Sequence, residues 1–211
     1  MSSATPTSGS PGDTADRRHF IRATLDLGAV RLHPWGRGPA GPEATADALV
    51  AAAADPLIAL WNPLATTSRD DALAWLAARD EGWTRGGAAA FAALDAADGA
   101  VLGSVTVRWV DRADGLAMIG YWTLPAARGR GLATRATEAA TRWAFATADA
   151  RRIEIAHAVG NPASCRVAQR CGYPAEGTLR DSHRFGDGAH HDEHLHARLA
   201  TDPEPAARQP A

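Results

Sequence analysis

The amino-acid sequence predicts a mixed α/β fold, because strand-like and helix-like segments follow one another in the order β-α-α-β-β-β-α-β-α-β-β. Turns containing Asp-Gly lie between apolar runs, which is typical of β-hairpins. A glycine-containing loop joins one strand-like run to an Ala-rich helical run. At 211 residues the chain is long enough for one well-buried domain and short for two.

The first part of the chain is expected to hold one strand and two helices. The strand signal lies over residues 25–32. A helix is predicted over residues 42–54, since Pro56 cannot continue it. Ser68 with Asp71 three residues later has the pattern of a capping box, so a second helix is expected to begin there.

The later elements follow from turn and capping residues. A helix is expected over residues 133–148, which contain no Pro or Gly. Asn161 followed by Pro162 is typical of a helix start, and Gly172 of a helix end. Further strands are predicted over residues 88–94, 101–110, 116–124 and 152–157, and two last strands flank a glycine turn at residues 186–188.

Composition and charge narrow the class of protein. The net charge of -2 gives no sign of a nucleic-acid or membrane partner. No apolar run approaches the ~18 residues that a membrane span needs, and the N-terminus lacks the pattern of a secretory signal. Cys165 and Cys171 fall in one predicted helix, where they are poor disulfide partners. We therefore expect a cytoplasmic protein.

One folded domain is expected over residues 19–200. Residues 1–18 are Ser, Thr, Pro, Gly and Ala with scattered charges, too poor in apolar groups to order themselves. Residues 201–211 are similar in composition and are expected to form a flexible tail. We expect a monomer or a homodimer.

The most informative segment for function is the loop from Arg128 to Ala133. Gly129 and Gly131 allow the backbone to come close to a ligand, and the first N–H groups of the following helix have no intrahelical partner. Those donors, the positive end of the helix dipole and the side chains of Arg128 and Arg130 suit a pyrophosphate. The spacing matches neither the P-loop nor the dinucleotide-binding fingerprint.

This loop resembles that of the GNAT superfamily of acetyl-CoA-dependent N-acetyltransferases. The family's loop has Arg or Gln, then Gly three residues later, then Gly or Ala, which Arg128, Gly131 and Ala133 match. The chain is most similar to the branch that includes the ribosomal-protein N-terminal acetyltransferases. The resemblance continues in the family's order through residues 119–122, 161–164, 171–173, 176–177 and 191–192.

The resemblance implies a GNAT fold, with a central, mostly antiparallel sheet, a parallel splayed pair of strands at the acetyl-CoA site, and helices on both faces. Backbone groups of the strand over residues 121–124 are then expected to bind the pantetheine and to polarise the thioester carbonyl, while the rings of Tyr121 and Trp122 lie in the core. The residues implied to bind acetyl-CoA are Tyr121, Trp122, Thr123, Leu124, Arg128, Gly129, Arg130, Gly131, Ala133, Thr134, Asn161 and Ser164.

The resemblance also implies roles for two residues at the start of the short helix. Asn161 has two open roles, as a helix cap and as a ligand of the pantetheine arm. Ser164 lies at the third helical position, and the resemblance implies that it is the general acid for the CoA thiolate. The alternative for Ser164 is a solvated side chain in the first turn.

The general base is less evident, because the position where related enzymes often carry Glu is Met118 here. Ribosomal-protein members have a Glu near the place of His183, so His183 is the first candidate. Glu176, Asp181, His157 and a water chain are the alternatives. A site without a strong base favours an amine of low pKa, such as a protein N-terminus or a small α-amino compound.

A metal site is an alternative interpretation of the histidine-rich last strand. Strand alternation puts His194, His196 and Asp192 on one face and Glu193 on the other. The pair His191-Asp192 also fits the pattern of the resembled family. We therefore expect no metal, although the segment holds His190, His191, His194 and His196 together with Asp192 and Glu193.

The expected function is acetyl transfer from acetyl-CoA to a primary amine by direct attack in a ternary complex. The acceptor is a protein N-terminal α-amine or a small molecule such as an antibiotic or metabolite. Residues 61–64 and the last hairpin near His183 are expected to shape its pocket. A non-catalytic acyl-CoA-binding sensor and an interaction module without a CoA site are the alternatives from other classes.

Overall fold

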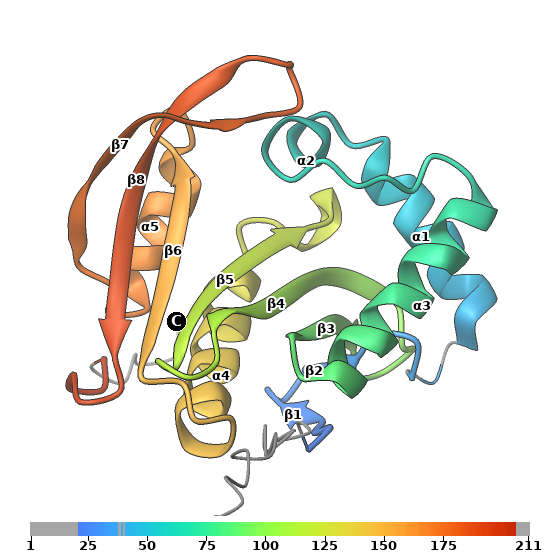
Figure 1. Ribbon diagram of the computed structural model, residues 1–211. Helices are drawn as coiled ribbons and strands as arrows, with labels where there is room; N and C mark the ends of the chain where they lie inside the picture. The colour runs from blue at the N-terminus through green and yellow to red at the C-terminus, as the bar shows by residue number, and fades with distance from the viewer. Residues whose placement is uncertain (1–20, 38, 40, 206–211) are drawn as a thin grey trace, which may run out of the picture.

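The computed structural model describes residues 21–37, 39 and 41–205, which form one sheet and its covering helices (Figure 1). The predicted N-terminal tail and residues 206–211 lie outside the described residues. The strands are β1 Leu25–Asp26, β2 Val30–Pro34, β3 Ala88–Asp95, β4 Val101–Asp111, β5 Leu116–Thr123, β6 Arg152–Ala158, β7 Ala175–Arg184 and β8 His190–Leu199. The helices are α1 Gly41–Ala53, α2 Pro56–Trp61, α3 Arg69–Arg85, α4 Leu132–Thr147 and α5 Pro162–Arg170, with a 3-10 turn over Pro125–Ala127.

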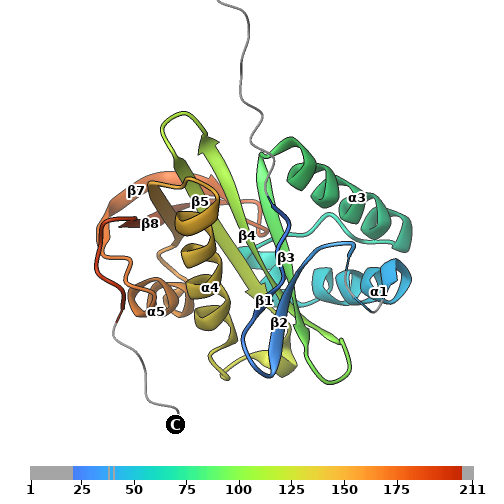
Figure 2. The same cartoon turned by 90° about the horizontal axis from the view of Figure 1, so that it is seen from below.

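The strand order is β1-β2-β3-β4-β5-β6-β8-β7, and every neighbouring pair is antiparallel except β5 and β6. Helices α4 and α5 lie on one face of the sheet, and α1 and α3 lie on the other (Figure 2). The predicted fold class is therefore confirmed: the sheet is mostly antiparallel, it contains one parallel pair, and helices cover both faces.

Strand β3 shows why the sheet is covered on both sides. Its residues alternate between two cores, because successive side chains of a strand point to opposite faces. Ala89, Phe91 and Ala93 lie in the core that includes α4. Ala90, Ala92 and Leu94 lie in the second core, with residues of α1, α2 and α3. A strand buried on both faces reads as a continuous apolar run, as this one does.

Helix α3 begins and ends as its sequence predicts. The Ser68 hydroxyl accepts from the Asp71 N–H at 3.1 Å, and the Asp71 carboxylate accepts from the Ser68 N–H at 3.0 Å, which completes the capping box. Gly86 ends the helix in the left-handed conformation. These caps fix the length of the helix that covers the second core.

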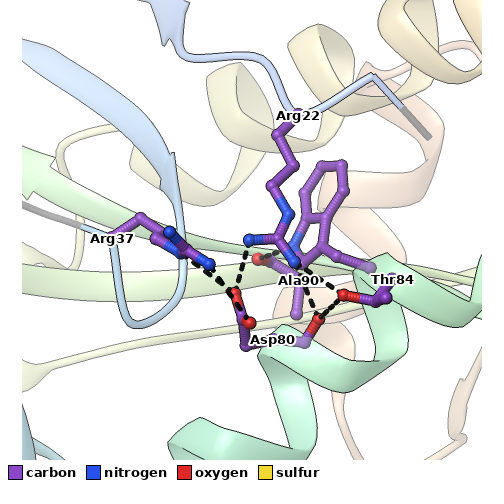
Figure 3. A network of polar contacts seen from close by, with 6 residues as sticks. Arg22, Arg37, Asp80, Thr84 and Ala90 are labelled. Atoms are coloured by element: carbon purple, nitrogen blue, oxygen red, sulfur yellow. Dashed lines mark hydrogen bonds and ion pairs between the residues drawn. The ribbon is translucent and has the colours of Figure 1, made fainter. Parts of the chain in front are cut away.

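A polar network fastens the segments that flank the first hairpin to α3 (Figure 3). Arg22 donates to the Asp80 carboxylate at 2.6 Å and to the Thr84 hydroxyl at 2.9 Å. Arg37 donates to the same carboxylate at 3.2 Å. The hydrogen bond from Arg37 and the charges of both arginines lower the pKa of Asp80.

The structure corrects two expectations about the first part of the chain. The single strand predicted over residues 25–32 is divided into β1 and β2, because Gly28 adopts a φ of 80° and the chain turns there. Helix α2 is additional. Pro56 does not only end the preceding helix; it is the first residue of a new one, whose N-terminus is capped by the Asp55 carboxylate.

The parallel pair β5 and β6 is short. Residues 116–118 of β5 pair with residues 152–154 of β6, whereas β5 continues to Thr123 and β6 to Ala158. The remaining halves of the two strands therefore diverge, as Figure 1 shows. Among the described residues, no helix combines the length and apolar character required to span a membrane.

Candidate active site

A cavity of about 540 Å³ opens where β5 and β6 diverge. Its walls come from the diverging halves of both strands, the N-termini of α4 and α5, helix α2 and the β7–β8 hairpin. Most predicted site residues line it, whereas Leu124 and Arg130 do not. The predicted site residues in the lining are Tyr121, Trp122, Thr123, Arg128, Gly129, Gly131, Ala133, Thr134, Asn161, Ser164 and His183.

The glycine loop forms one end of the cavity. Gly129 and Gly131 adopt φ values of 74° and 69°, which side chains of L residues rarely adopt. A Cβ atom at either glycine would meet nothing within 4 Å, so the backbone there faces open space. Gly131 is the N-cap of α4, and the following N–H groups have no intrahelical acceptor. This loop can accept an anion through its backbone.

The side chain of Arg128 already has partners within the protein. Its guanidinium donates to the carboxylate of Asp55 and to the Thr123 carbonyl, the latter at 3.2 Å. The hydrogen bond from Arg128 is the largest cause of a lowered pKa of Asp55. Arg128 therefore joins the N-terminus of α2 to the end of β5, a role that the sequence pattern did not indicate.

The edge of β5 that faces the cavity offers backbone donors. The Tyr121 carbonyl accepts from the Asn62 side chain at 3.1 Å, and the Thr123 carbonyl accepts from Arg128. In a strand, the N–H and C=O of one residue point to the same edge. The N–H groups of Tyr121 and Thr123 consequently face the same open edge, where no strand of the described residues pairs with them.

The rings of Tyr121 and Trp122 differ in their surroundings. Trp122 is buried in the second core and stacks with Trp35 at a centroid distance of 6.1 Å. Tyr121 is half-buried, and its hydroxyl donates to the Ser164 carbonyl at 3.2 Å. Tyr121 thereby connects β5 to α5 across the cavity, and burial raises the pKa of its hydroxyl.

The N-terminus of α5 forms a second wall of the cavity. The Asn161 side-chain oxygen accepts from the Ser164 N–H at 3.2 Å, which makes Asn161 the helix cap. Only the amide nitrogen of Asn161 then remains to contact a ligand as a donor. Ser164 is the third helical residue, as expected, and it is half-buried in the cavity lining.

The acid–base candidates fall into two groups. Glu176 forms a two-point ion pair with Arg152 at 2.6 and 3.0 Å and does not line the cavity, and neither does Asp181. His183 and His157 both line it. His183 is exposed and lies against Phe185 at a centroid distance of 5.0 Å, whereas burial lowers the pKa of His157.

The structure adds Glu193, which the sequence did not single out as a base. Its side chain lines the cavity, is 9% exposed, and accepts a 2.8 Å hydrogen bond from the Ser182 hydroxyl. Strand alternation had separated it from His194 and His196. This alternation was the sequence feature that could have identified Glu193 as a separate candidate, because it places Glu193 on the face of β8 opposite to the two histidines.

Helix α2 lies beside the end of the β7–β8 hairpin (Figure 1), and residues of both line the cavity. The Gly186 N–H donates to the Leu60 carbonyl at 2.9 Å, and the Trp61 ring contacts Phe185 edge-on at 5.6 Å. A Cβ atom on Gly186 would lie 1.7 Å from the Ala59 carbonyl oxygen, so only glycine fits this approach. Two segments were expected to shape an acceptor pocket, and residues of both line the cavity. Trp61 and Asn62 come from residues 61–64, and His183 and Phe185 come from the last hairpin.

Comparison with known proteins relates this architecture to acetyltransferases. The "Putative ribosomal N-acetyltransferase YdaF" of Bacillus subtilis is 35% identical over 95 residues, 45% of this chain and 51% of that protein. The ribosomal-protein-serine acetyltransferase of Escherichia coli is 30% identical over 99 residues, 47% of this chain and 55% of that protein. The chain thus spans about half the length of the curated relatives it matches.

Solved structures share the fold. The ribosomal L7/L12 alpha-N-protein acetyltransferase RimL, solved in complex with coenzyme A, superposes with a TM-score of 0.72 at 22% identity. The match covers 84% of this chain and 98% of that one. The family of acetyltransferase (GNAT) domains matches residues 39–174. Because this match extends over more than half of the chain, the protein belongs to the GNAT acetyltransferase domain family.

Proposed function

We propose that the protein is an acetyl-CoA-dependent N-acetyltransferase that acts on a primary amine in a ternary complex. The observation that carries this proposal is the single cavity at the divergence of β5 and β6, into which the glycine loop, the open edge of β5 and Ser164 all face. An anion-binding loop, backbone donors and a hydroxyl at a helix N-terminus are the groups that a thioester substrate requires.

The glycine loop is proposed to hold the pyrophosphate of acetyl-CoA. Support comes from the positive φ values at Gly129 and Gly131, the open space beside them and the N-terminus of α4. RimL, which has the same fold, was solved with coenzyme A. Arg130 is exposed and can reach a phosphate from outside the cavity. In this role the backbone contributes more than Arg128, which is engaged with Asp55.

The groups on β5 and α5 are proposed to carry out the acetyl transfer. The amine nitrogen attacks the thioester carbonyl carbon, and an N–H group at the open edge of β5 stabilises the charge that develops on the carbonyl oxygen. The C–S bond then breaks, and Ser164 donates a proton to the departing thiolate. The positive end of the α5 helix dipole favours the alkoxide that remains on Ser164 until it regains a proton.

The proton of the attacking amine needs an acceptor, and two residues of the lining are suited to it. Glu193 is buried and held by Ser182, so its carboxylate is fixed in place. His183 is exposed and also lines the cavity. We assign Glu193 as the first candidate base because its position is fixed, and His183 as the second.

The acceptor is proposed to be an α-amine. Deprotonation at pH 7 costs about 4–5 kcal/mol for a lysine amine and about 1–1.5 kcal/mol for an α-amine, so a site with one modest base favours the latter. One relative is named a ribosomal-protein-serine acetyltransferase and another a putative ribosomal N-acetyltransferase, which supports a protein N-terminus in the cytoplasm as the acceptor. A small α-amino compound is the second candidate, since about 540 Å³ also accommodates one.

The first experiment measures release of the CoA thiol from acetyl-CoA with two sets of acceptors. One set contains peptides with N-terminal Ala or Ser, and the other contains small amines. An enzyme-only blank corrects for Cys165 and Cys171. Turnover in the peptide set supports N-terminal acetylation. Turnover with small amines alone would identify a metabolite or an antibiotic as the acceptor. Binding of acetyl-CoA without turnover in either set would instead identify a sensor.

Variants assign the proton transfers. Ser164→Ala is expected to lower kcat about 100-fold with little change in the KM for acetyl-CoA. Thr178→Ala, which removes an exposed hydroxyl on β7, is the matched control and should leave kcat unchanged. Glu193→Gln is expected to lower kcat by a similar factor. If His183→Gln has that effect and Glu193→Gln does not, His183 is the base.

A further inference from the structure

A group of nitrogen and sulfur side chains lies where α5 packs against the sheet, outside the chemistry described above. The three histidines lie on one face of the sheet, because His157 of β6 stands directly opposite His194 of β8, and His196 is two residues further along. The cysteine comes from the second turn of α5, which contacts this face. We call this group the His3Cys cluster; its members are His157, Cys165, His194 and His196.

The ligand atoms of the cluster converge. All four lie within 4.8 Å of one another. The Nε2 atoms of His157 and His196 are 3.3 Å apart, and Cys165 Sγ is 3.8 Å from His196 Nε2. His157 is 5% exposed and His196 is fully buried, while the other two members are half-buried. The cluster is thus a small, largely dry polar site.

Hydrogen bonds at the far side of the rings fix which nitrogen carries the proton. His157 Nδ1 lies 2.9 Å from the Ala158 carbonyl oxygen, and His196 Nδ1 lies 3.0 Å from the Tyr173 carbonyl oxygen. A carbonyl only accepts, so each Nδ1 is the donor, and each Nε2 of a neutral ring presents its lone pair. Two lone pairs then lie close to each other at 3.3 Å, an arrangement that repels unless a proton or a metal ion lies between the two nitrogens.

We propose that the His3Cys cluster binds one divalent transition-metal ion of the zinc class. Tetrahedral zinc has bonds of about 2.05 Å to nitrogen and about 2.3 Å to sulfur, which separate two nitrogens by about 3.3 Å and a nitrogen from a sulfur by about 3.5 Å. The separations of 3.3 and 3.8 Å in the cluster are close to these values. Backbone carbonyls that hold the outer nitrogen of each ring are also the usual second partners of metal-binding histidines.

The ligand set indicates a structural site. Four protein ligands complete a tetrahedron and leave no position for a substrate. The ion would join β6, β8 and α5, and it would hold the turn of α5 that follows Ser164. This proposal departs from the expectation of no metal, which considered the last strand alone. The completing ligands, His157 and Cys165, come from β6 and α5 and become neighbours only in the fold.

The test uses the full chain without an affinity tag. Metal content of the purified protein is measured by inductively coupled plasma mass spectrometry, and Zn²⁺ and Co²⁺ are then titrated into protein freed of metal with a chelator. We expect one equivalent per chain and a Co²⁺ spectrum with tetrahedral d–d bands and a thiolate charge-transfer band. Zinc at 100 times its Kd is expected to raise the Tm by about 5–10 °C.

Cys165 and His194 are the half-buried members of the cluster, so their substitution is expected to leave the protein folded. Cys165→Ser is expected to abolish the thiolate band and to weaken Zn²⁺ binding at least tenfold, and His194→Ala is expected to weaken it similarly. The matched control is His190→Ala, an exposed histidine on the same strand and outside the cluster, which should bind Zn²⁺ like the parent protein. Circular dichroism confirms that each variant is folded.

Three results would overturn the proposal. The first is the absence of stoichiometric binding to the folded parent protein. The second is a Co²⁺ complex without a thiolate band. The third is equal loss of affinity in His190→Ala and His194→Ala, which would indicate surface histidines acting together. None of these readouts depends on acetyl transfer, so the failure of either proposal leaves the other testable.

Discussion

The contact between Arg128 and Asp55 allows a sharp test of how the cavity is built. Asp55 performs two tasks, since it caps α2 through the Leu57 and Ile58 N–H groups at 3.1 and 3.0 Å and also accepts from Arg128. Asp55→Asn keeps an oxygen for the cap and removes the charge. Asp55→Ala removes both. Comparison of the two variants separates the ion pair from the cap.

The magnitude follows from burial. The Asp55 side chain is 9% exposed, and that of Arg128 is 31% exposed. A hydrogen bond to a charged group contributes about 1.5–3 kcal/mol, and the partial exposure of Arg128 favours the lower end, about 1.5 kcal/mol for Asp55→Asn. Loss of the cap adds about 1 kcal/mol, so Asp55→Ala is expected to cost about 2.5 kcal/mol. Each kcal/mol lowers the Tm by about 2–4 °C in a chain of this size.

Urea unfolding at pH 7 measures the loss of unfolding free energy in Asp55→Asn and in Asp55→Ala. The control is Asp26→Asn, at an exposed turn. The pKa of Asp55 is lowered in the folded protein, so its contribution is present above the unfolded pKa of about 3.9 and is lost as the pH falls through the folded value. The reasoning is refuted if Asp55→Asn costs no more than Asp26→Asn, or if Asp55→Ala costs no more than Asp55→Asn.

Three further variants test other parts of the structure. Gly131→Val is expected to weaken acetyl-CoA binding at least tenfold by calorimetry, whereas Gly28→Val, with a similar positive φ and equally open surroundings, should leave binding intact and share a strain cost of about 1–2 kcal/mol. Gly186→Ala should separate the hairpin from α2 and cost about 1–3 kcal/mol in urea unfolding, while Gly177→Ala, at an open position of β7, should be neutral. Asp80→Asn should cost about 1 kcal/mol at pH 7, and its difference from the parent should shrink below pH 3.9, because the pKa of Asp80 is lowered by its hydrogen bond from Arg37.

Much of the fold could be predicted because its signals are local. The capping box at Ser68, the Asn161-Pro162 start of α5 and the glycine loop each determine the geometry of neighbouring residues. The division of the first strand at Gly28 and the start of α2 at Pro56 were missed because each residue type is compatible with two local structures. Glycine is tolerated within a strand or makes a turn, and proline ends one helix or begins the next.

The candidate site was predictable where the backbone forms it and less so where distant side chains meet. The loop from Arg128 to Ala133 is contiguous, so its pattern identifies it. The partnership of Arg128 with Asp55 joins residues 73 positions apart, and no spacing rule connects them. Glu193 and the His3Cys cluster depend in the same way on the register between β6 and β8.

The contact of the hairpin with α2 has a topological consequence. Main chain and hydrogen bonds form a closed ring around the cavity, from the short pairing of β5 with β6, through β8 and the hairpin to Leu60, and from Asn62 back to Tyr121. An object inside a ring enters or leaves only along the axis, unless the ring opens. A free chain end or a single long side chain can be threaded through such an opening, whereas a folded segment of main chain is wider and needs the ring to open.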